Sequence, residues 1–217
     1  TTSNDLAAVQ SAELVVVALK PQVAPDVLPS LATHLNTAQI VVSVMAGMPT
    51  SALEAHLGAR QPVVRVMPQT LVQLGAGATA VCVGSAADAA ALAAVRALFD
   101  RVGTTVEVSE AQMDAVTGLS GSGPAYIYIV IEALADGGVR AGLSREVALQ
   151  LAAQTAAGAG RMVLETATHP AALRDQVTSP AGTTIAGLTQ LEQGGVRHAF
   201  IAAVDAATRR SRELGKG

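Results

Sequence analysis

The run Leu14-Val-Val-Val-Ala-Leu19 is apolar throughout, and Lys20-Pro21 ends it. A continuous apolar run of this length is typical of a strand that is buried on both faces of a parallel sheet. Four more segments are predicted strands: 39–44, 62–66, 77–84 and 104–108. Three segments with a helical pattern lie among them: 22–34, 50–57 (with Thr50 or Ser51 as its cap) and 86–101. This alternation predicts an α/β first half with a parallel, doubly wound sheet.

The second half of the sequence has a helical pattern almost throughout. Short turns rich in Gly, Pro and Ser are expected to interrupt it at 120–124, 142–144, 168–170, 178–182 and 193–195. Gly and Pro end helices, and a serine before an apolar-periodic run, such as Ser144, is a good N-cap. We therefore predict two domains, an α/β domain at 1–108 and an all-α domain at 109–217.

One turn of the helical half carries chemistry of its own, Asp175-Gln-Val-Thr-Ser-Pro-Ala-Gly-Thr-Thr-Ile-Ala-Gly-Leu188. Ser179 is the predicted N-cap of the following helix, Pro180 suits its first turn, and Gly182 allows backbone to approach a ligand closely. The free N–H groups and the positive dipole end of such a helix bind anions, so a small carboxylate fits there. An ordinary capped helix without a ligand fits the same spacing.

Composition excludes several classes of function. The net charge is −3 and no Lys/Arg run exists, which argues against a nucleic-acid partner. No apolar stretch reaches the roughly 18–20 residues that cross a bilayer, so no membrane partner is expected. The single cysteine, Cys82, lies in an apolar run and is expected to be buried, and it favours a cytoplasmic setting. Small apolar side chains give a thin core, which a second subunit often completes.

Four other features are interpreted as structural. Gly75-Ala-Gly77-Ala-Thr-Ala80 has the letters of a dinucleotide fingerprint, but it precedes a strand, so it is interpreted as a turn. Gly118-Leu-Ser-Gly-Ser-Gly123 indicates a close contact between helices. The charged run 209–213 is expected to be a solvated helix face. The histidines show no metal-ligand spacing, so no metal site is predicted: His34, His56, His169 and His198.

Seven segments, in chain order, resemble the pyrroline-5-carboxylate reductase family: 17–22, 43–47, 65–70, 75–77, 114–126, 132–138 and 175–188. The most specific are Asp114-Ala-Val-Thr-Gly-Leu-Ser-Gly-Ser-Gly-Pro-Ala-Tyr126 and the segment 175–188. The resemblance implies a Rossmann-type NAD(P)-binding domain followed by an all-α dimerisation domain. It implies an oxidoreductase that uses NADPH or NADH to reduce 1-pyrroline-5-carboxylate to L-proline, the last step of proline biosynthesis. It also implies a homodimer, with higher assemblies of dimers in some members.

The resemblance assigns substrate-site roles residue by residue. Thr184 matches the catalytic threonine, whose hydroxyl donates to the ring nitrogen of the substrate. The amides of Thr183 and Thr184 match the cradle of the substrate carboxylate, which Ser179 and Gly182 shape. Glu110 falls where the family has a glutamate near the substrate.

The resemblance also assigns residues to the cofactor, and it places the active site between the nucleotide domain of one subunit and the helical domain of its partner. The loop after the first predicted strand supplies Ala18, Leu19, Lys20 and Pro21, and the end of the next strand supplies Ala46 and Gly47. Gln176 stands where some members place an asparagine near the cofactor. Asp5 stands where an asparagine touches the adenosine end.

The sequence departs from the family at three places. Gln69-Thr-Leu71 replaces the usual Asn-Thr-Pro, which is expected to loosen a turn. Ala181 replaces a usual glycine, and alanine costs roughly 1 kcal/mol if that position needs a positive φ. The glycine-rich first βαβ unit, roughly 30–50 residues, does not precede Thr1, so the nucleotide domain is expected to be N-terminally incomplete and to bind dinucleotide poorly. The strand 14–19 would then have an exposed apolar edge.

Two alternatives remain open from the sequence. One is a related two-domain NAD(P)-dependent reductase that acts on other imines or on 3-hydroxy acids. Enzymes of the latter kind commonly use a lysine of the helical domain, and no lysine lies between Lys20 and Lys216. The other alternative is a non-catalytic dimerisation fragment.

Overall fold

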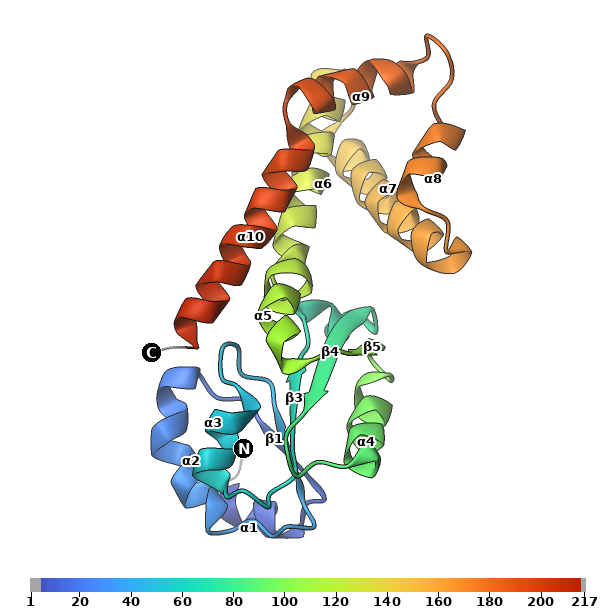
Figure 1. Cartoon of the computed structure of the whole chain (residues 1–217). Helices are drawn as coiled ribbons and strands as arrows, with labels where there is room; N and C mark the ends of the chain where they lie inside the picture. Colours follow the sequence, from blue (N-terminus) through green and yellow to red (C-terminus); the bar gives the residue numbers. More distant parts are fainter. Residues whose placement is uncertain (1–4, 216–217) are drawn as a thin grey trace. The chain divides into compact units, whose positions relative to one another are not determined.

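The computed structural model describes the backbone of residues 5–215 and the side chains of residues 8–215. Contacts divide the chain into two compact units (Figure 1). Unit 1 comprises Thr1–Pro124 together with Val204–Gly217, and unit 2 comprises Ala125–Ala203. The domain boundary predicted between residues 108 and 109 lies where the strands end and the helices begin, and not where the contacts divide the chain. It stays a prediction.

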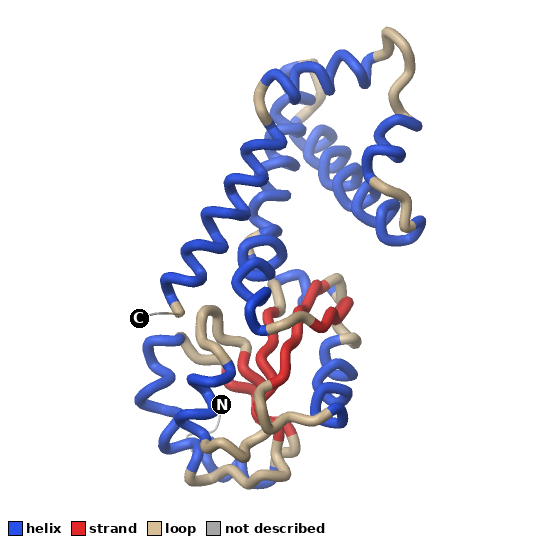
Figure 2. The backbone as a smooth tube through the Cα atoms, in the orientation of Figure 1, coloured by secondary structure: helices blue, strands red, loops and turns tan. Residues whose placement is uncertain are grey.

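Unit 1 contains a five-stranded sheet in the order β1-β2-β3-β4-β5. Figure 2 shows the strands in red. The strands are β1 (Leu14–Val17), β2 (Ile40–Ser43), β3 (Val63–Met67), β4 (Gly77–Val83) and β5 (Gly103–Glu107). Three neighbouring pairs are parallel, but β3 and β4 are antiparallel. The prediction of an entirely parallel sheet was wrong at this pair. Only residues 68–76 connect these strands, whereas a parallel crossover needs about a dozen residues or more.

Helices cover both faces of the sheet. They are α1 (Asp5–Ser11), α2 (Ala24–Ala32, after the 3-10 turn Pro21–Val23), α3 (Thr50–Leu57) and α4 (Ala89–Phe99). Leu28 of α2 and Leu53 of α3 are fully buried in one hydrophobic cluster with residues of β1, β2 and β3. Val95 of α4 belongs to a second cluster with Val42, Val64 and Val81. The two clusters show why strands buried on both faces have uninterrupted apolar sequences, and they give the expected three-layer Rossmann-type arrangement.

The segment between β3 and β4 is an ordered turn. It contains the 3-10 helix Thr70–Leu74, and the side chain of Gln69 caps it by accepting a hydrogen bond from the amide of Leu71 at 3.3 Å. Gly75 ends this helix with φ at +68°. The predicted turn is confirmed at Gly75 and Ala76, whereas β4 begins at Gly77. The expectation that Gln69-Thr-Leu71 loosens a turn stays a prediction.

The chain leaves the sheet through a continuous helical segment. A 3-10 turn (Glu110–Gln112), α5 (Met113–Val116) and a π turn (Thr117–Gly121) lead into α6 (Gly123–Arg140). The break expected at 120–124 is present as a single bend at Ser122, between the π turn and α6. Gly118 in this turn lies against α10 (Val196–Leu214), where an added side chain would overlap Thr208. This confirms the predicted close contact between helices.

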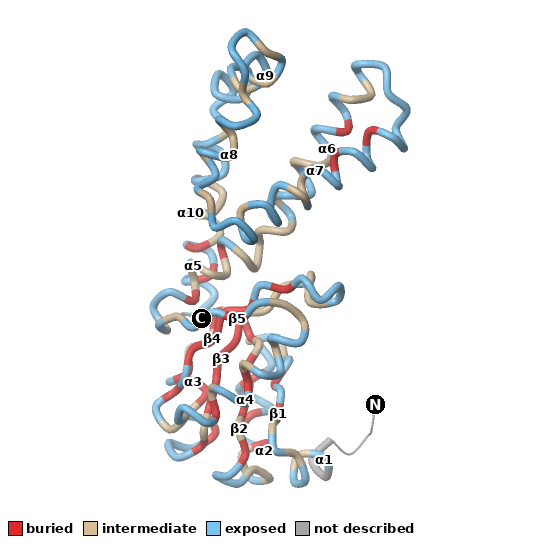
Figure 3. Tube along the Cα trace, turned by 90° about the vertical axis from the view of Figure 1, so that its right-hand side faces the viewer, coloured by how far each residue is buried: buried red, intermediate tan, exposed pale blue. Residues whose placement is uncertain are grey.

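Unit 2 is entirely helical, and its core is thin. Its further helices are α7 (Arg145–Thr166), α8 (Pro170–Gln176) and α9 (Thr183–Gln193), so the other four predicted breaks are confirmed. The buried cluster consists of Ala135, Ala148 and Ala152, while Leu164 and Ile201 remain 82 % and 63 % exposed. Figure 3 shows buried residues mainly on the strands of unit 1 and few in α6 to α9. None of the described helices combines the length and apolar character that crossing a bilayer requires.

Candidate active site

Two predicted cofactor loops begin side by side at the carboxyl edge of the sheet. Val17 of β1 is in register with Ser43 of β2, and the amide of Val44 continues the ladder by donating to the carbonyl of Val17 at 3.2 Å. The residues predicted to contact cofactor follow directly: Ala18, Leu19, Lys20, Pro21, Ala46 and Gly47. Ligands of open α/β sheets bind beyond the carboxyl ends of the strands. The structure thus brings these residues together where a nucleotide is expected.

A cavity of about 320 Å³ lies beside these loops. Pro21 and Gly47 line it from the predicted set, and Leu214 and Gly215 line it from the end of α10. Gly47 is buried and has φ at +75°, a conformation that other residues rarely adopt. Sequence reasoning missed Leu214 and Gly215, because no local pattern indicates that the end of the chain returns to the sheet.

Glu110 links three elements of unit 1. Its carboxylate accepts hydrogen bonds from the guanidinium of Arg65 on β3 and, at 3.2 Å, from the amide of Thr50 at the start of α3. The thiol of Cys82 on β4 donates to it at 3.5 Å. No side chain of the N-cap residue Pro49 caps α3, so the prediction of Thr50 or Ser51 as cap was wrong. Glu110 performs this role from a distant part of the chain.

Electrostatics in this cluster follow from the contacts. Burial alone would raise the pKa of Glu110, but hydrogen bonds from Thr50 and Arg65 and the charge of Arg65 outweigh it and hold the pKa below its ordinary value of 4.5. Burial, with a smaller contribution from the charge of Glu110, raises the pKa of the Cys82 thiol to about 12. The predicted burial of Cys82 is confirmed, since it is 3 % exposed. Glu110 is ionised and Cys82 is protonated at neutral pH.

The start of α9 differs from its prediction. The amide of Gly182 donates to the carbonyl of Ser179 at 3.1 Å, which closes a turn with Pro180 second and Ala181 third. Ala181 has φ at +57°, as the third residue of a type II turn requires. The N-cap of α9 is Gly182, so the prediction of Ser179 as N-cap was wrong. A residue with positive φ cannot lie in a helical turn, which is why α9 begins only at Thr183.

The first turn of α9 nevertheless has the features of an anion site. Within residues 5–215, no backbone carbonyl accepts a hydrogen bond from the amides of Thr183 or Thr184, and no side chain caps them. The backbone at Gly182 lies directly against Ser179. Glycine permits this close approach, since a side chain at this position would overlap the Ser179 hydroxyl. The helix is eleven residues long, so its N-terminal end carries a partial positive charge. Such an end can hold a carboxylate.

Comparison with known proteins gives the family. The model described as pyrroline-5-carboxylate reductase dimerisation matches residues 110–214, and that described as NADP oxidoreductase coenzyme F420-dependent matches residues 1–47. Pyrroline-5-carboxylate reductase of Methanosarcina acetivorans is 46 % identical over 99 % of this chain and 80 % of the relative. That of Arabidopsis thaliana is 48 % identical over 95 % of this chain and 74 % of the relative. The chain belongs to the pyrroline-5-carboxylate reductase family.

Solved structures of the same family have the same fold. The Coxiella burnetii enzyme is 37 % identical and matches with a TM-score of 0.93. The match covers all of this chain and 81 % of that one. The Plasmodium falciparum enzyme, whose crystal structure has NADP bound, is 33 % identical with a TM-score of 0.91, over 99 % of this chain and 81 % of that one. These matches confirm the resemblance and the predicted fold class, a Rossmann-type domain followed by a helical dimerisation domain.

The loops of this reductase fit a nicotinamide dinucleotide. Between β1 and α2, and between β2 and α3, they carry no acidic side chain, and exposed Lys20 adds a positive charge. An anionic dinucleotide therefore meets no like charge on these loops. The side chain of Asp5, predicted at the adenosine end, lies outside the described residues.

The remaining predicted residue, Gln176, lies in unit 2. It is the last residue of α8, and it lines a mainly apolar cavity of about 620 Å³ between α7 and α8. A cofactor role for Gln176 stays a prediction, as does a substrate role for Glu110, whose two oxygens are both engaged within unit 1.

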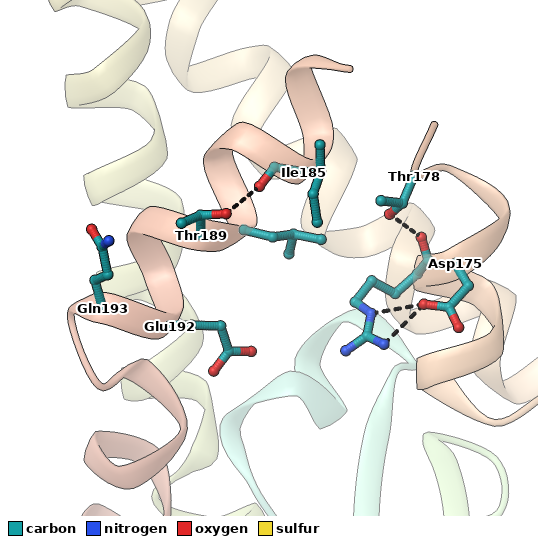
Figure 4. Close-up of a pocket in the computed structure, with 8 residues that line it drawn as sticks. Asp175, Thr178, Ile185, Thr189, Glu192 and Gln193 are labelled. Atoms are coloured by element: carbon teal, nitrogen blue, oxygen red, sulfur yellow. Dashed lines mark hydrogen bonds and ion pairs between the residues drawn. The ribbon is translucent and has the colours of Figure 1, made fainter. Parts of the chain in front are cut away.

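A further cavity, of about 420 Å³, lies between α8 and α9 (Figure 4). Several of its polar groups have partners nearby. The hydroxyl of Thr178 donates to the carbonyl of Arg174, and that of Thr189 donates to the carbonyl of Ile185. Arg174 pairs with Asp175 at 2.8 Å. None of the predicted substrate residues lines this cavity, so it is distinct from the anion site at the start of α9.

Proposed function

We propose that this chain is a pyrroline-5-carboxylate reductase, an oxidoreductase that reduces 1-pyrroline-5-carboxylate to L-proline with NADPH or NADH. This reaction is the last step of proline biosynthesis. One observation carries the proposal. At the start of α9, two threonine hydroxyls accompany amides that have no carbonyl partner among the described residues, in a chain whose relatives bear this name.

The substrate has a carboxylate and a cyclic imine, and the start of α9 offers a group for each. The amides of Thr183 and Thr184 bind the carboxylate, and the turn of Ser179 and Gly182 holds these amides in place. The hydroxyl of Thr184 donates to the ring nitrogen, which makes the imine carbon more electrophilic without adding a charge. Catalysis then depends on orientation, which can contribute several kcal/mol, and not on a dedicated general base.

The cofactor side of the site is assigned to unit 1. The residues that hold the dinucleotide are Ala18, Leu19, Lys20, Pro21, Ala46 and Gly47. When bound, the reduced nicotinamide supplies the hydride. The chain itself contributes a loop free of acidic groups and the backbone of Gly47, which permits close approach.

The proposal includes a homodimer, in which the second subunit covers the exposed apolar surface of unit 2. The match to a dimerisation domain and the exposure of Leu164 and Ile201 support it. We propose further that the nucleotide domain of one subunit and the helical domain of the other form each active site, and that dimers associate into higher assemblies. A cytoplasmic location is also proposed, and it rests on the single cysteine.

Substitution of Thr184 tests the proposal in the full gene product. Oxidation of proline or thioproline with NAD(P)⁺, and reduction of pyrroline-5-carboxylate, measure the activity. Thr184→Ala should lower kcat/KM by roughly 10–1000-fold, a loss of about 1.4–4 kcal/mol. Thr189→Ala is the matched control, because the Thr189 hydroxyl bonds to its own helix at 2.9 Å.

The outcomes separate the alternatives. Full activity of Thr184→Ala would rule out the role of this hydroxyl. A stable dimer of the natural sequence without reductase activity would indicate the non-catalytic dimerisation module. Activity on 3-hydroxy acids or other imines alone would indicate the related reductase class.

A further inference from the structure

The last turn of α10 lies in direct contact with the loop between β2 and α3. The amide of Gly215 donates to the carbonyl of Ser211 at 3.2 Å, so helical hydrogen bonding continues to this residue. A side chain on Gly215 would overlap the carbonyl oxygen of Gly47. A Cβ on Gly47 would in turn lie 3.1 Å from the amide nitrogen of Gly215. The two backbones touch, and glycine at 215 is what allows it.

This part of α10 is firmly anchored within unit 1. The hydroxyl of Ser211 donates to the carboxylate of Asp114 at 2.7 Å, and Ser211 is only 3 % exposed. One turn earlier, Thr208 is buried against Gly118 of the π turn. The run 209–213, predicted to be a solvated face, therefore contains a buried polar contact. Two anchors on one helix fix the position of its last turn.

The loop that receives this turn is held at its other end as well. Glu110 accepts from the amide of Thr50, which follows the loop directly. Within the loop, Gly47 is buried and has a positive φ. Leu214 and Gly215 line the same cavity as Gly47 and Pro21. The end of α10 thus packs against the middle of the loop.

We propose that Leu214 and Gly215 are positioning residues for the cofactor loop at Gly47. The proposal rests on the proposed function, since it concerns how the reductase presents this loop to its nicotinamide cofactor. The last turn of α10 restricts the loop to one backbone conformation before cofactor binds. A loop that is already ordered loses less entropy on binding, so the restraint strengthens cofactor affinity.

Two substitutions in the full gene product test the proposal. Gly215→Val inserts a side chain between the two backbones, and Leu214→Ala removes most of the side chain that lines the cavity beside the loop without obstructing the loop. The matched control is Glu213→Ala in the same turn, whose carboxylate is exposed and pairs with Arg210 at 2.8 Å. Hydrogen–deuterium exchange of residues 44–49 without cofactor, and NADPH binding followed by its fluorescence, are the measurements.

Both test variants should exchange faster in the loop and bind NADPH more weakly, by about 5–10-fold for Gly215→Val and about threefold for Leu214→Ala. The KM for pyrroline-5-carboxylate should change less than twofold, and far-UV circular dichroism should stay unchanged. Glu213→Ala should match the natural sequence in every measurement.

Unchanged loop exchange and NADPH affinity in Leu214→Ala would overturn the proposal, since Gly215→Val alone could act by obstruction. If the protein without substitutions binds NADPH but does not reduce pyrroline-5-carboxylate, the proposed function is refuted instead. In that case loop exchange and NADPH affinity still decide the role of Leu214 and Gly215.

Discussion

The carboxylate of Glu110 accepts a hydrogen bond from the backbone amide of Thr50, sixty residues earlier in the chain, at 3.2 Å. The same carboxylate pairs with Arg65, which is 4 % exposed. One side chain therefore caps α3 and neutralises a buried cation on β3. One guanidinium nitrogen of Arg65 has no partner in the described part of the chain, which leaves this cation dependent on Glu110.

Removing this carboxylate should destabilise the protein. Glu110→Ala leaves Arg65 without its counter-ion and the first amide of α3 without its acceptor. We expect a loss of about 2 kcal/mol in the free energy of unfolding, below the ~3–5 kcal/mol for a fully buried pair because Glu110 is 35 % exposed. Urea unfolding at fixed protein concentration measures it. Glu107→Ala, an exposed neighbour, should change stability by less than about 0.5 kcal/mol.

The same group should make stability depend on acid pH. The pKa of Glu110 is lower in the folded protein than its ordinary 4.5, so the folded state favours the ionised form. Its contribution is therefore present above pH 4.5 and is lost as the pH falls through the folded pKa. The difference in Tm between the natural protein and Glu110→Gln should shrink between pH 7 and pH 3. A difference that stays constant over this range would contradict the assignment.

The thiol of Cys82 should be unreactive in the folded protein. It is buried, and its pKa of about 12 keeps it protonated at pH 8. A thiol reagent such as DTNB should label no cysteine in native protein, and one per chain after unfolding in urea, because the chain has one cysteine. Rapid labelling under native conditions would show that β4 opens readily.

Ala181 should be a position where glycine is preferred. Its φ of +57° costs alanine about 1–2 kcal/mol, while the greater freedom of glycine in the unfolded chain offsets about 0.4–1 kcal/mol. Ala181→Gly should therefore leave stability unchanged or raise it, by up to about 1 kcal/mol. The same substitution at Ala186, inside α9, should lower it by about 1 kcal/mol. Thermal unfolding that gives both substitutions the same sign would refute the turn.

Gly182 should be sensitive because of Ser179, not because of its own φ. A side chain at Gly182 overlaps the Ser179 hydroxyl, whose displacement should disturb the amides of Thr183 and Thr184. Gly182→Ala should raise the KM for pyrroline-5-carboxylate about tenfold with a smaller effect on the KM for NADPH. The double variant with Ser179→Ala should recover part of the loss. A single variant with unchanged KM would show that the turn adapts.

Local patterns were sufficient for the elements of this fold, because they depend on neighbouring residues. Apolar runs such as 14–19 gave the strands, and Gly and Pro gave the helix breaks, of which the one at 120–124 is a single bend. The direction of β4 was missed although the short connection at 68–76 indicates it. The break at 178–182 was predicted, but the N-cap of the following helix was placed at Ser179 instead of Gly182, although Pro180 two residues before Gly182 indicates a turn there. Contacts between distant segments left no local signal. Glu110 with Thr50 and Gly215 with Gly47 are such pairs.

The bond between Ser211 and Asp114 joins residues 97 positions apart, and it lies inside unit 1. That unit is therefore discontinuous in sequence. During synthesis on the ribosome, its sheet can form early, but the surface around Asp114 and Gly118 stays uncovered until α10 emerges. A protein released before residue 204 would keep all five strands and still lack the segment that completes the first unit.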